Sequence, residues 1–175
     1  MPISFEFLQL HVLKHDKNTQ RTLLALMLLA VMAGCSTVPE ANTPPAELAI
    51  EQSWSGDYPV AELKLLPPEQ QQLASGYLGS AAAFAPVWAA FKPGETVPAV
   101  DFGKQAVVFH RNVTYYNRTR IFKVTLKNGV AEVLATATMS AIPITDKVAM
   151  SMAVIPRAGV KAIQVGPVRI PVHTQ

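Results

Sequence analysis

Short apolar segments between residues 105 and 165 restrict the possible folds more than any other feature of this chain. Five of them are rich in β-branched residues and are bounded by polar or turn-forming residues, as β-strands are: 105–111, 120–126, 130–138, 148–155 and 160–165. Asn128-Gly129 separates the second segment from the third, and this dipeptide favours the type I′ turn of a tight hairpin. We therefore expect a mostly antiparallel β structure.

Alternation within these segments predicts which side chains share a face. In the second segment we expect Phe122, Val124 and Leu126 to lie on one face of the sheet, because successive side chains of a strand point to opposite sides. Pro167 and Pro171 predict that the last strand lies at a sheet edge, since proline cannot donate a hydrogen bond to a neighbouring strand.

The segment 48–91 is expected to be irregular at first and then helical. Pro-Pro-Glu at 67–69 is typical of a helix start and predicts a helix over 70–77. Ser80 is a suitable N-cap for a second helix, on which Phe84, Trp88 and Phe91 recur at helical spacing. We interpret this aromatic stripe as facing the core; the alternative is a platform for a ligand.

The predicted fold class is α+β: one or two N-terminal helices, followed by a mostly antiparallel five- or six-stranded sandwich or partly open barrel. The chain has 175 residues, which suggests a single domain. A formal net charge of +3 is too mild to indicate nucleic-acid binding.

An uncharged apolar run occupies residues 23–34, after Lys14, Lys17 and Arg21. A membrane-spanning helix needs about 20 apolar residues, so this run is too short to span a bilayer comfortably. A basic segment, a short apolar run and small residues at its end are typical of a cleaved export signal. The single cysteine, Cys35, follows the run directly, and one cysteine excludes an intrachain disulfide.

Residues 32–35 (Met-Ala-Gly-Cys) resemble the lipobox of bacterial lipoproteins. The resemblance implies that the chain is cleaved before Cys35 and that this cysteine carries the lipid that anchors the protein in a membrane. Ser36 and Thr37 follow with no Asp at the sorting position, which by analogy with Gram-negative lipoproteins favours the outer membrane and a domain facing the periplasm. The alternative is an ordinary secreted protein in which Cys35 is incidental.

This interpretation divides the chain into three parts. Residues 1–34 are the predicted lipoprotein signal peptide, 35–47 a lipidated flexible tether, and 48–175 a single globular α+β domain. The tether is assigned from its prolines and small polar residues, which cannot bury a core.

The sequence does not indicate a catalytic site. A Ser–His–Asp arrangement would need Asp101, His110 and Ser140 or Ser151, yet no Gly-x-Ser-x-Gly motif is present and His110 lies in mid-strand. His110, His173 and scattered carboxylates lack the spacing of metal ligands, and no glycine-rich phosphate-binding motif occurs. We therefore predict a protein that is not an enzyme and has no metal site and no cofactor; a hydrolase using His110 is the less favoured alternative.

Basic and aromatic residues are interleaved between residues 104 and 127, and no acid occurs between Asp101 and Glu132. Arg and Tyr are enriched at protein interfaces, because they bury a large area and still offer polar contacts. We therefore predict that a partner binds at Arg111, Tyr115, Tyr116, Asn117, Arg118 and Arg120. The alternative, a solvated strand face with ordinary surface charges, is the more common arrangement.

The loop 138–146 is unusually apolar for a connection, since it carries Met139, Ile142 and Ile144. Exposed side chains would make it a docking patch for a protein, and buried ones would make it a cap on the sheet. We expect the cap.

A helix bearing Trp88, the segment 97–102 (Val-Pro-Ala-Val-Asp-Phe) and the segment 105–109 (Gln-Ala-Val-Val-Phe) follow one another in the order seen in the PrcB family of protease-complex subunits. The hairpin at Asn128-Gly129 and a penultimate strand ending in Ile155-Pro156 fit the same order. Over about residues 83–172 the chain thus resembles this family, which implies a non-catalytic domain that binds another envelope protein, with a protease as one candidate.

The predicted function is that of a lipid-anchored, non-catalytic envelope protein. Its expected partners are the membrane, through the lipid on Cys35, and an unidentified envelope protein, with no nucleic acid and no small-molecule cofactor. A structural lipoprotein that contacts peptidoglycan is the alternative.

Overall fold

Nine strands, one α-helix and two short 3-10 helices occupy residues 44–173, the part of the chain that the computed structural model describes. The predicted signal peptide, Cys35 and the tether up to residue 43 lie outside the described residues. In chain order the elements are β1 (Ala46–Leu48), β2 (Gln52–Pro59), η2 (Val60–Leu65), η3 (Pro68–Gln70), β3 (Ser75–Leu78), α2 (Ala81–Phe91), β4 (Gln105–Arg111), β5 (Thr119–Lys127), β6 (Val130–Ala137), β7 (Lys147–Pro156), β8 (Ala162–Val165) and β9 (Val168–Pro171).

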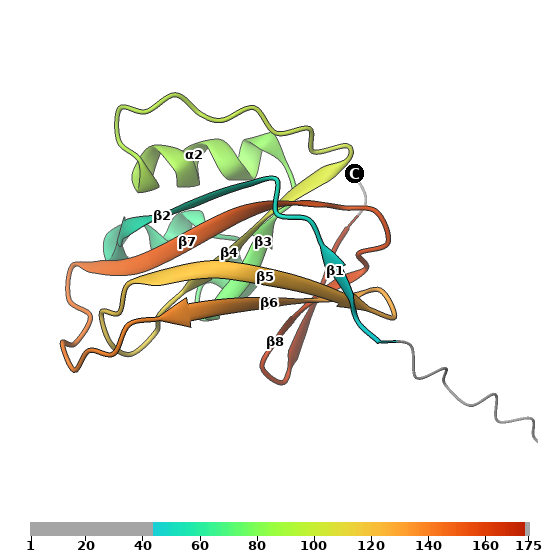
Figure 1. Ribbon diagram of the computed structural model, residues 1–175. Coiled ribbons are helices and arrows are strands. Elements are labelled where there is room, and N and C mark those ends of the chain that lie inside the picture. The colour runs from blue at the N-terminus through green and yellow to red at the C-terminus, as the bar shows by residue number, and fades with distance from the viewer. Residues whose placement is uncertain (1–43, 174–175) are drawn as a thin grey trace, which may run out of the picture. The chain divides into compact units, whose positions relative to one another are not determined.

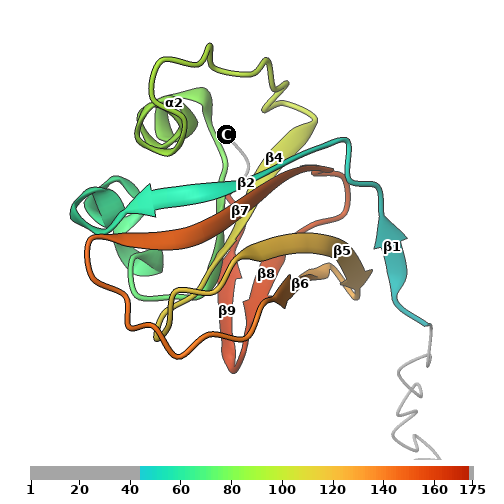
Figure 2. The same ribbon diagram turned by 60° about the vertical axis from the view of Figure 1, so that its left-hand side comes forward.

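The strands form two separate sheets. The central sheet has the order β2-β7-β4-β3 and is antiparallel throughout; the outer sheet has the order β1-β5-β6-β8-β9 and is antiparallel except where β6 and β8 run parallel. Figures 1 and 2 show α2 on one side of the central sheet and the outer sheet on the other. The expected sandwich is therefore present in coarse outline, with one main helix and more strands than expected, and the two sheets do not close into a barrel.

The inner strands of the central sheet, β4 and β7, are buried on both faces. On β7, Met150 and Met152 belong to the core beneath α2, whereas Ala153 and Ile155 belong to the core between the sheets. Every residue from 148 to 155 is buried as a result. A strand covered on both sides needs apolar residues at nearly every position, which explains the nearly continuous apolar sequence of β7.

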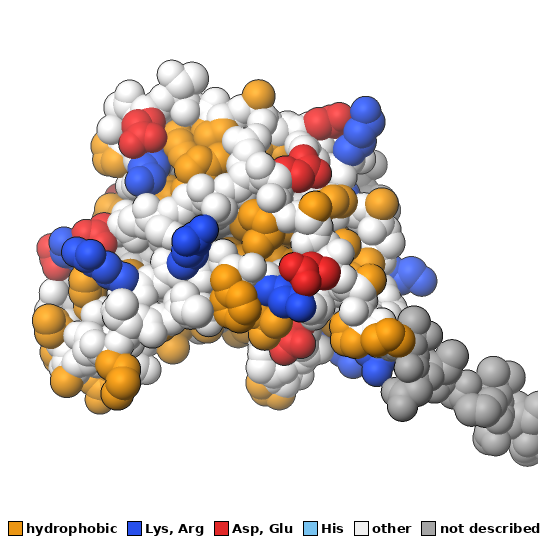
Figure 3. All heavy atoms as spheres, viewed as in Figure 1, with side chains coloured by type: hydrophobic (Ala, Val, Ile, Leu, Met, Phe, Trp, Pro, Cys, Tyr) orange, Lys and Arg blue, Asp and Glu red, His pale blue; other side chains and the backbone are white. Residues whose placement is uncertain are grey.

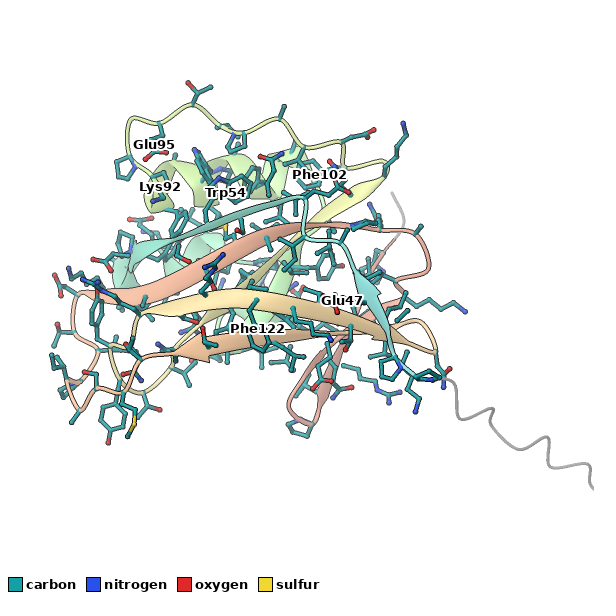
Figure 4. The ribbon with its side chains drawn as sticks, in the orientation of Figure 1. Glu47, Trp54, Lys92, Glu95, Phe102 and Phe122 are labelled. Atoms are coloured by element: carbon teal, nitrogen blue, oxygen red, sulfur yellow. The ribbon has the colours of Figure 1, made fainter. Side chains whose placement is uncertain are left out.

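The helix predicted after Ser80 is confirmed as α2. The Ser80 side chain accepts a hydrogen bond from the backbone N–H of Ala83 at 3.2 Å and so caps the first turn. Phe84 and Trp88 are buried against the central sheet, which confirms that the stripe faces the core. Trp54 of β2 points toward them (Figure 4), and its ring centroid lies 5.0 Å from that of Trp88.

The helix predicted over 70–77 is wrong, because η3 ends at Gln70, a turn follows, and β3 begins at Ser75. The backbone N–H of Tyr77 donates to the Gln70 side-chain oxygen at 2.7 Å, and β3 pairs with β4. Gly76 permits this close approach: a Cβ there would lie 2.2 Å from Gln70 Oε1 and 2.6 Å from the Phe109 ring. Pairing with a distant strand has overridden the local helical pattern.

Two strands lie where the sequence indicated none. β2 is rich in Ser, Gly and Asp, yet it pairs with β7 from Gln52 opposite Val154 to Pro59 opposite Lys147. β1 begins at Ala46, so the last two residues of the predicted tether, 46 and 47, are part of the outer sheet. Both strands are at sheet edges, where fewer side chains are buried and the apolar pattern is weak.

A bulge in β5 changes the predicted faces. Ile121 pairs with Ala135 and Lys123 with Leu134, which leaves Phe122 as the extra residue. Phe122 is therefore exposed on the outer sheet (Figure 4), whereas Val124 is fully buried. The prediction that these two residues share a face is wrong.

The sandwich has two ends of different character. At one end lie the loops 112–118 and 138–146, which join β4 to β5 and β6 to β7; we call this the loop end. At the other lie the turn at Asn128-Gly129, the turn 157–161 and the loop 101–104; we call this the hairpin end. Ala46 pairs with Leu126 there, so the described chain begins at the hairpin end (Figure 1). No helix among the described residues is long and apolar enough to cross a membrane.

Candidate functional site

The two loops at the loop end pair with each other. The backbone N–H of Tyr116 donates to the carbonyl of Ile142 at 2.8 Å, and Tyr115 and Pro143 form an isolated β-bridge. Arg118 and Thr138 are joined twice: the Thr138 N–H donates to the Arg118 carbonyl at 2.9 Å, and the Arg118 N–H donates to the Thr138 hydroxyl at 3.0 Å. These bonds hold the loops as one surface.

This surface exposes large apolar side chains. Val113 and Tyr115 are exposed on the first loop, while on the second Ile142 is 64% exposed and Met139 fully so. Figure 3 shows hydrophobic side chains gathered over these loops, at the lower left. The expectation that the second loop caps the sheet holds only for Ile144, which packs against the core beneath α2. Contiguous exposed apolar side chains are typical of protein-docking surfaces.

A groove of about 740 Å³ adjoins the loops and is lined partly by Asp57, Phe91, Pro93, Tyr116, Arg118 and Lys147. Asp57 accepts two side-chain hydrogen bonds in this groove: the Tyr116 hydroxyl donates to Asp57 Oδ1, and Lys147 Nζ donates to Asp57 Oδ2 at 2.7 Å. Lys147 Nζ also lies 5.4 Å from the centre of the Tyr116 ring. The strand β2 thus ties the first loop to the start of β7.

These contacts determine the charge states in the groove. Burial alone would raise the pKa of Asp57, but hydrogen bonds from Lys147 and Tyr116 and the nearby cations lower it overall. The hydrogen bond to Asp57 raises the pKa of the Tyr116 hydroxyl, and the same carboxylate raises the pKa of Lys147. At neutral pH the groove therefore holds a carboxylate, an ammonium and a neutral phenol.

The residues predicted to bind a partner separate into two groups. Tyr115, Tyr116, Arg118 and Arg120 lie on or beside the surface of the loop end, and neither arginine forms an ion pair within the described part of the chain. Arg111 is only 5% exposed, and its guanidinium donates to the backbone carbonyls of residues 71 and 112. It holds β4 against the segment before β3 and is not available at the surface.

Asn117 is half-buried and stabilises the first loop from within. Its backbone carbonyl accepts a hydrogen bond from the Asn112 side chain, which closes the loop on itself. Its side-chain oxygen is buried and finds no partner among the described residues. This arrangement indicates that Asn117 shapes the surface rather than presenting a long side chain to a partner.

Asp57 and Lys147 were not predicted as site residues. Asp57 lies in a strand that sequence patterning did not reveal, and Lys147 is the first residue of β7. Their proximity arises from the β2–β7 register, in which Asp57 is opposite Ala149 and Pro59 is opposite Lys147. Only knowledge of that pairing could have brought these two residues together.

The residues considered for hydrolase chemistry do not come together as a Ser–His–Asp triad, because Asp101 lies far from His110. Asp101 precedes β4, while His110 is near its far end, about 16 Å along a strand from Gln105. His110 Nδ1 instead lies 2.8 Å from Ser75 Oγ, on the neighbouring strand. The buried Ser151 is opposite His110 in register, and its hydroxyl has no hydrogen-bond partner in the described chain.

The second serine considered for that chemistry, Ser140, lies in the loop 138–146, where its hydroxyl accepts a hydrogen bond from the N–H of Ile142. His173, considered as a metal ligand, is at the end of the described chain, with its carbonyl bound by Arg157. Residues 44–173 contain no cluster of three or more side chains suited to hold a metal ion.

Comparisons with known proteins yield no match: no protein-family model, no curated protein and no solved structure is significantly similar to this chain. The resemblances of residues 32–35 to a lipobox and of residues 83–172 to the PrcB family therefore stay predictions.

Proposed function

We propose that this protein is a lipid-anchored, non-catalytic protein of the bacterial cell envelope that binds another envelope protein at its loop end. The observation that carries the proposal is the distribution of features along the sandwich. The described chain begins at the hairpin end, and the exposed apolar surface is at the opposite end. A lipid on Cys35 in the outer membrane would thus leave the loop end free to meet a partner in the periplasm.

The chemistry of the loop end supports a protein as the partner. Val113, Tyr115, Met139 and Ile142 offer apolar area that water does not solvate well. Paired loops present these side chains on a fixed backbone, which reduces the entropy lost on binding. A partner segment with apolar side chains fits this surface best.

Arg118 and Arg120 specify the charge of that partner. Both side chains are exposed and without an ion pair in the described chain, so their guanidinium groups are available to carboxylates. We therefore expect acidic residues beside the apolar segment of the partner. A protease is one candidate, from the resemblance to the PrcB family.

Charge reversal tests the proposal. The double variant Arg118→Glu/Arg120→Glu should lose a partner that co-purifies with the lipidated wild-type protein, while the melting temperature stays the same. Arg169→Glu, an exposed charge reversal on β9 outside the loop end, should keep the partner. If both variants co-purified with the partner equally well, the assignment of the loop end as the binding surface would be overturned.

Labelling with palmitate tests the anchor separately. Incorporation into the wild-type chain and none into Cys35→Ser is the expected result. Absence of label from the wild type, or label that persists in the variant, would contradict lipidation at Cys35. Retention of the protein by purified sacculi, with no partner protein bound, would favour the alternative of a structural lipoprotein on peptidoglycan.

A further inference from the structure

A second groove, of about 760 Å³, lies at the hairpin end and has no role in the partner binding proposed above. Its lining is made by the loop before β4 and the turn after β7, and includes Phe102, Lys104, Arg157, Gly159, Val160 and Lys161. Three of the lining residues are cationic and none is acidic. The groove therefore favours an anionic ligand.

The cations of this groove are held in different ways. Arg157 is fixed at the groove, since its guanidinium donates to the carbonyl of Phe102 at 2.9 Å and to that of His173. Lys104 is 3.6 Å from Asp101, but its side chain is 85% exposed, so solvent screens this pair strongly. Lys161 is exposed and forms no ion pair in the described chain.

One more cation, Lys127, ends β5 beside this groove. The backbone N–H of Lys161 donates to the carbonyl of Gly129 at 2.7 Å, which places the turn 157–161 against the β5–β6 hairpin. Carboxylates also occur at the hairpin end: Asp101, Glu51, which accepts a hydrogen bond from Gln105, and Glu47 and Glu132, which are both opposite Thr125 in register. Glu47 is paired with Lys123 at 2.9 Å. None of these carboxylates lines the groove, so the lining itself is positive, with three cations and no acid.

The groove is next to the point at which the described chain begins. A Cβ added at Gly159 would lie 3.5 Å from Leu126, and Leu126 pairs with Ala46. Figure 3 shows Lys and Arg side chains at this right-hand end of the unit. Residues 36–45 can span at most about 35 Å in any conformation, so a lipid on Cys35 would keep the cations close to the membrane surface.

We propose that the groove at the hairpin end binds anionic phospholipid headgroups of the membrane that holds the lipid on Cys35. The inference rests on the anchor in the proposed function. An anionic membrane surface attracts nearby Lys and Arg, by roughly fivefold in binding constant for each cation. A tether supplies a high effective concentration of headgroups, so contacts that are weak individually orient the domain with its loop end away from the bilayer.

Lysine reactivity tests this contact on the unmodified protein. The lipidated full chain is placed in vesicles of phosphatidylcholine alone and in vesicles that contain an equal part of phosphatidylglycerol, and an amine-reactive label is quantified at each lysine by mass spectrometry. Labelling of Lys104, Lys127 and Lys161 should fall severalfold in the anionic vesicles. Lys64, which is exposed in η2 near the loop end, is the control and should not change. High salt should abolish the difference, because it screens the attraction.

A matched variant separates charge recognition from simple proximity. In Lys104→Gln/Lys161→Gln, Lys127 should regain most of the labelling that it loses in anionic vesicles. Equal labelling of the three lysines in both kinds of vesicle, with palmitate present on Cys35, would overturn the inference and leave the anchor intact. A chain without palmitate on Cys35 would overturn both the anchor and this inference.

Discussion

Asp57 illustrates how much of the candidate site depends on single side chains. Its carboxylate links β2, the first loop and the start of β7, through Tyr116 and Lys147. Its lowered pKa stabilises the folded state above the ordinary carboxyl pKa of 3.8, and this stabilisation is lost as the pH falls below that value. The contribution is modest, because the pair is largely exposed.

Removing the Tyr116 hydroxyl should show what its hydrogen bond contributes to the pKa of Asp57. In Tyr116→Phe the carboxylate of Asp57 loses a donor, so its pKa should rise relative to that of the wild type. A carboxyl-detected NMR titration measures this pKa directly. Tyr115→Phe removes a hydroxyl from the adjacent residue and should leave the pKa of Asp57 unchanged; an equal shift in both variants would contradict the assigned hydrogen bond.

His110 should make the stability depend on pH. Burial lowers its pKa in the folded state below the ordinary value of 6.5, so the unfolded chain takes up a proton first as the pH falls. The free energy of unfolding should therefore be highest above pH 6.5 and decrease below it. Urea denaturation at several pH values measures the free energy of unfolding of the wild type and of His110→Gln. Its decrease at low pH should be smaller in the variant. The same decrease in both proteins would refute this role of His110.

Residue-scale prediction from the sequence succeeded where the chemistry was local. Ser80 as an N-cap and Phe84 and Trp88 as core residues follow from spacing along one helix. Arg111 looked like a surface cation, because nothing in the neighbouring sequence reveals that it donates to a carbonyl 40 residues away. Whether a long cationic side chain is buried depends on the tertiary fold, which the spacing of residues in the sequence does not reveal.

At the scale of elements, strands with a strong apolar pattern were predicted and those without one were not. β4 coincides with its predicted range 105–111, and β5 and β6 flank the expected Asn128-Gly129 turn. Both residues of this turn have positive φ, as a type I′ turn requires. β1, β2 and β3 escaped prediction because pairing with other strands, rather than their own composition, stabilises them.

Gly76 is the residue that makes β3 possible, and its substitution tests this account. Gly76→Ala would place a methyl group 2.2 Å from Gln70 Oε1 and 2.6 Å from the Phe109 ring. We expect a loss of about 1–3 kcal/mol in the free energy of unfolding, as for other overpacked cores. In the control Gly103→Ala, the added Cβ would meet only the Asp101 carboxylate, at 3.1 Å. This variant should change the free energy of unfolding by less than about 0.5 kcal/mol. Equal stability of both variants would contradict the close approach.

At the scale of the whole molecule, the described unit separates its functions along the sandwich. The central sheet, covered by α2 and by the outer sheet, supplies the stability, and only its edge strand β2 and the start of β7 reach a groove at the surface. The loop end holds an apolar surface beside a charged groove, and the hairpin end holds a basic groove next to the beginning of the described chain. The proposed function requires this separation, because one end must face the membrane while the other binds a partner protein.

The position of the partner is the central claim, and site-specific photo-crosslinking tests it most directly. A photoreactive residue in place of Ile142, at the loop end, should crosslink one envelope protein in intact cells. The same residue in place of Val168, which is also exposed but lies at the start of β9, should not. Crosslinking of the same protein from Val168 and none from Ile142 would contradict the account.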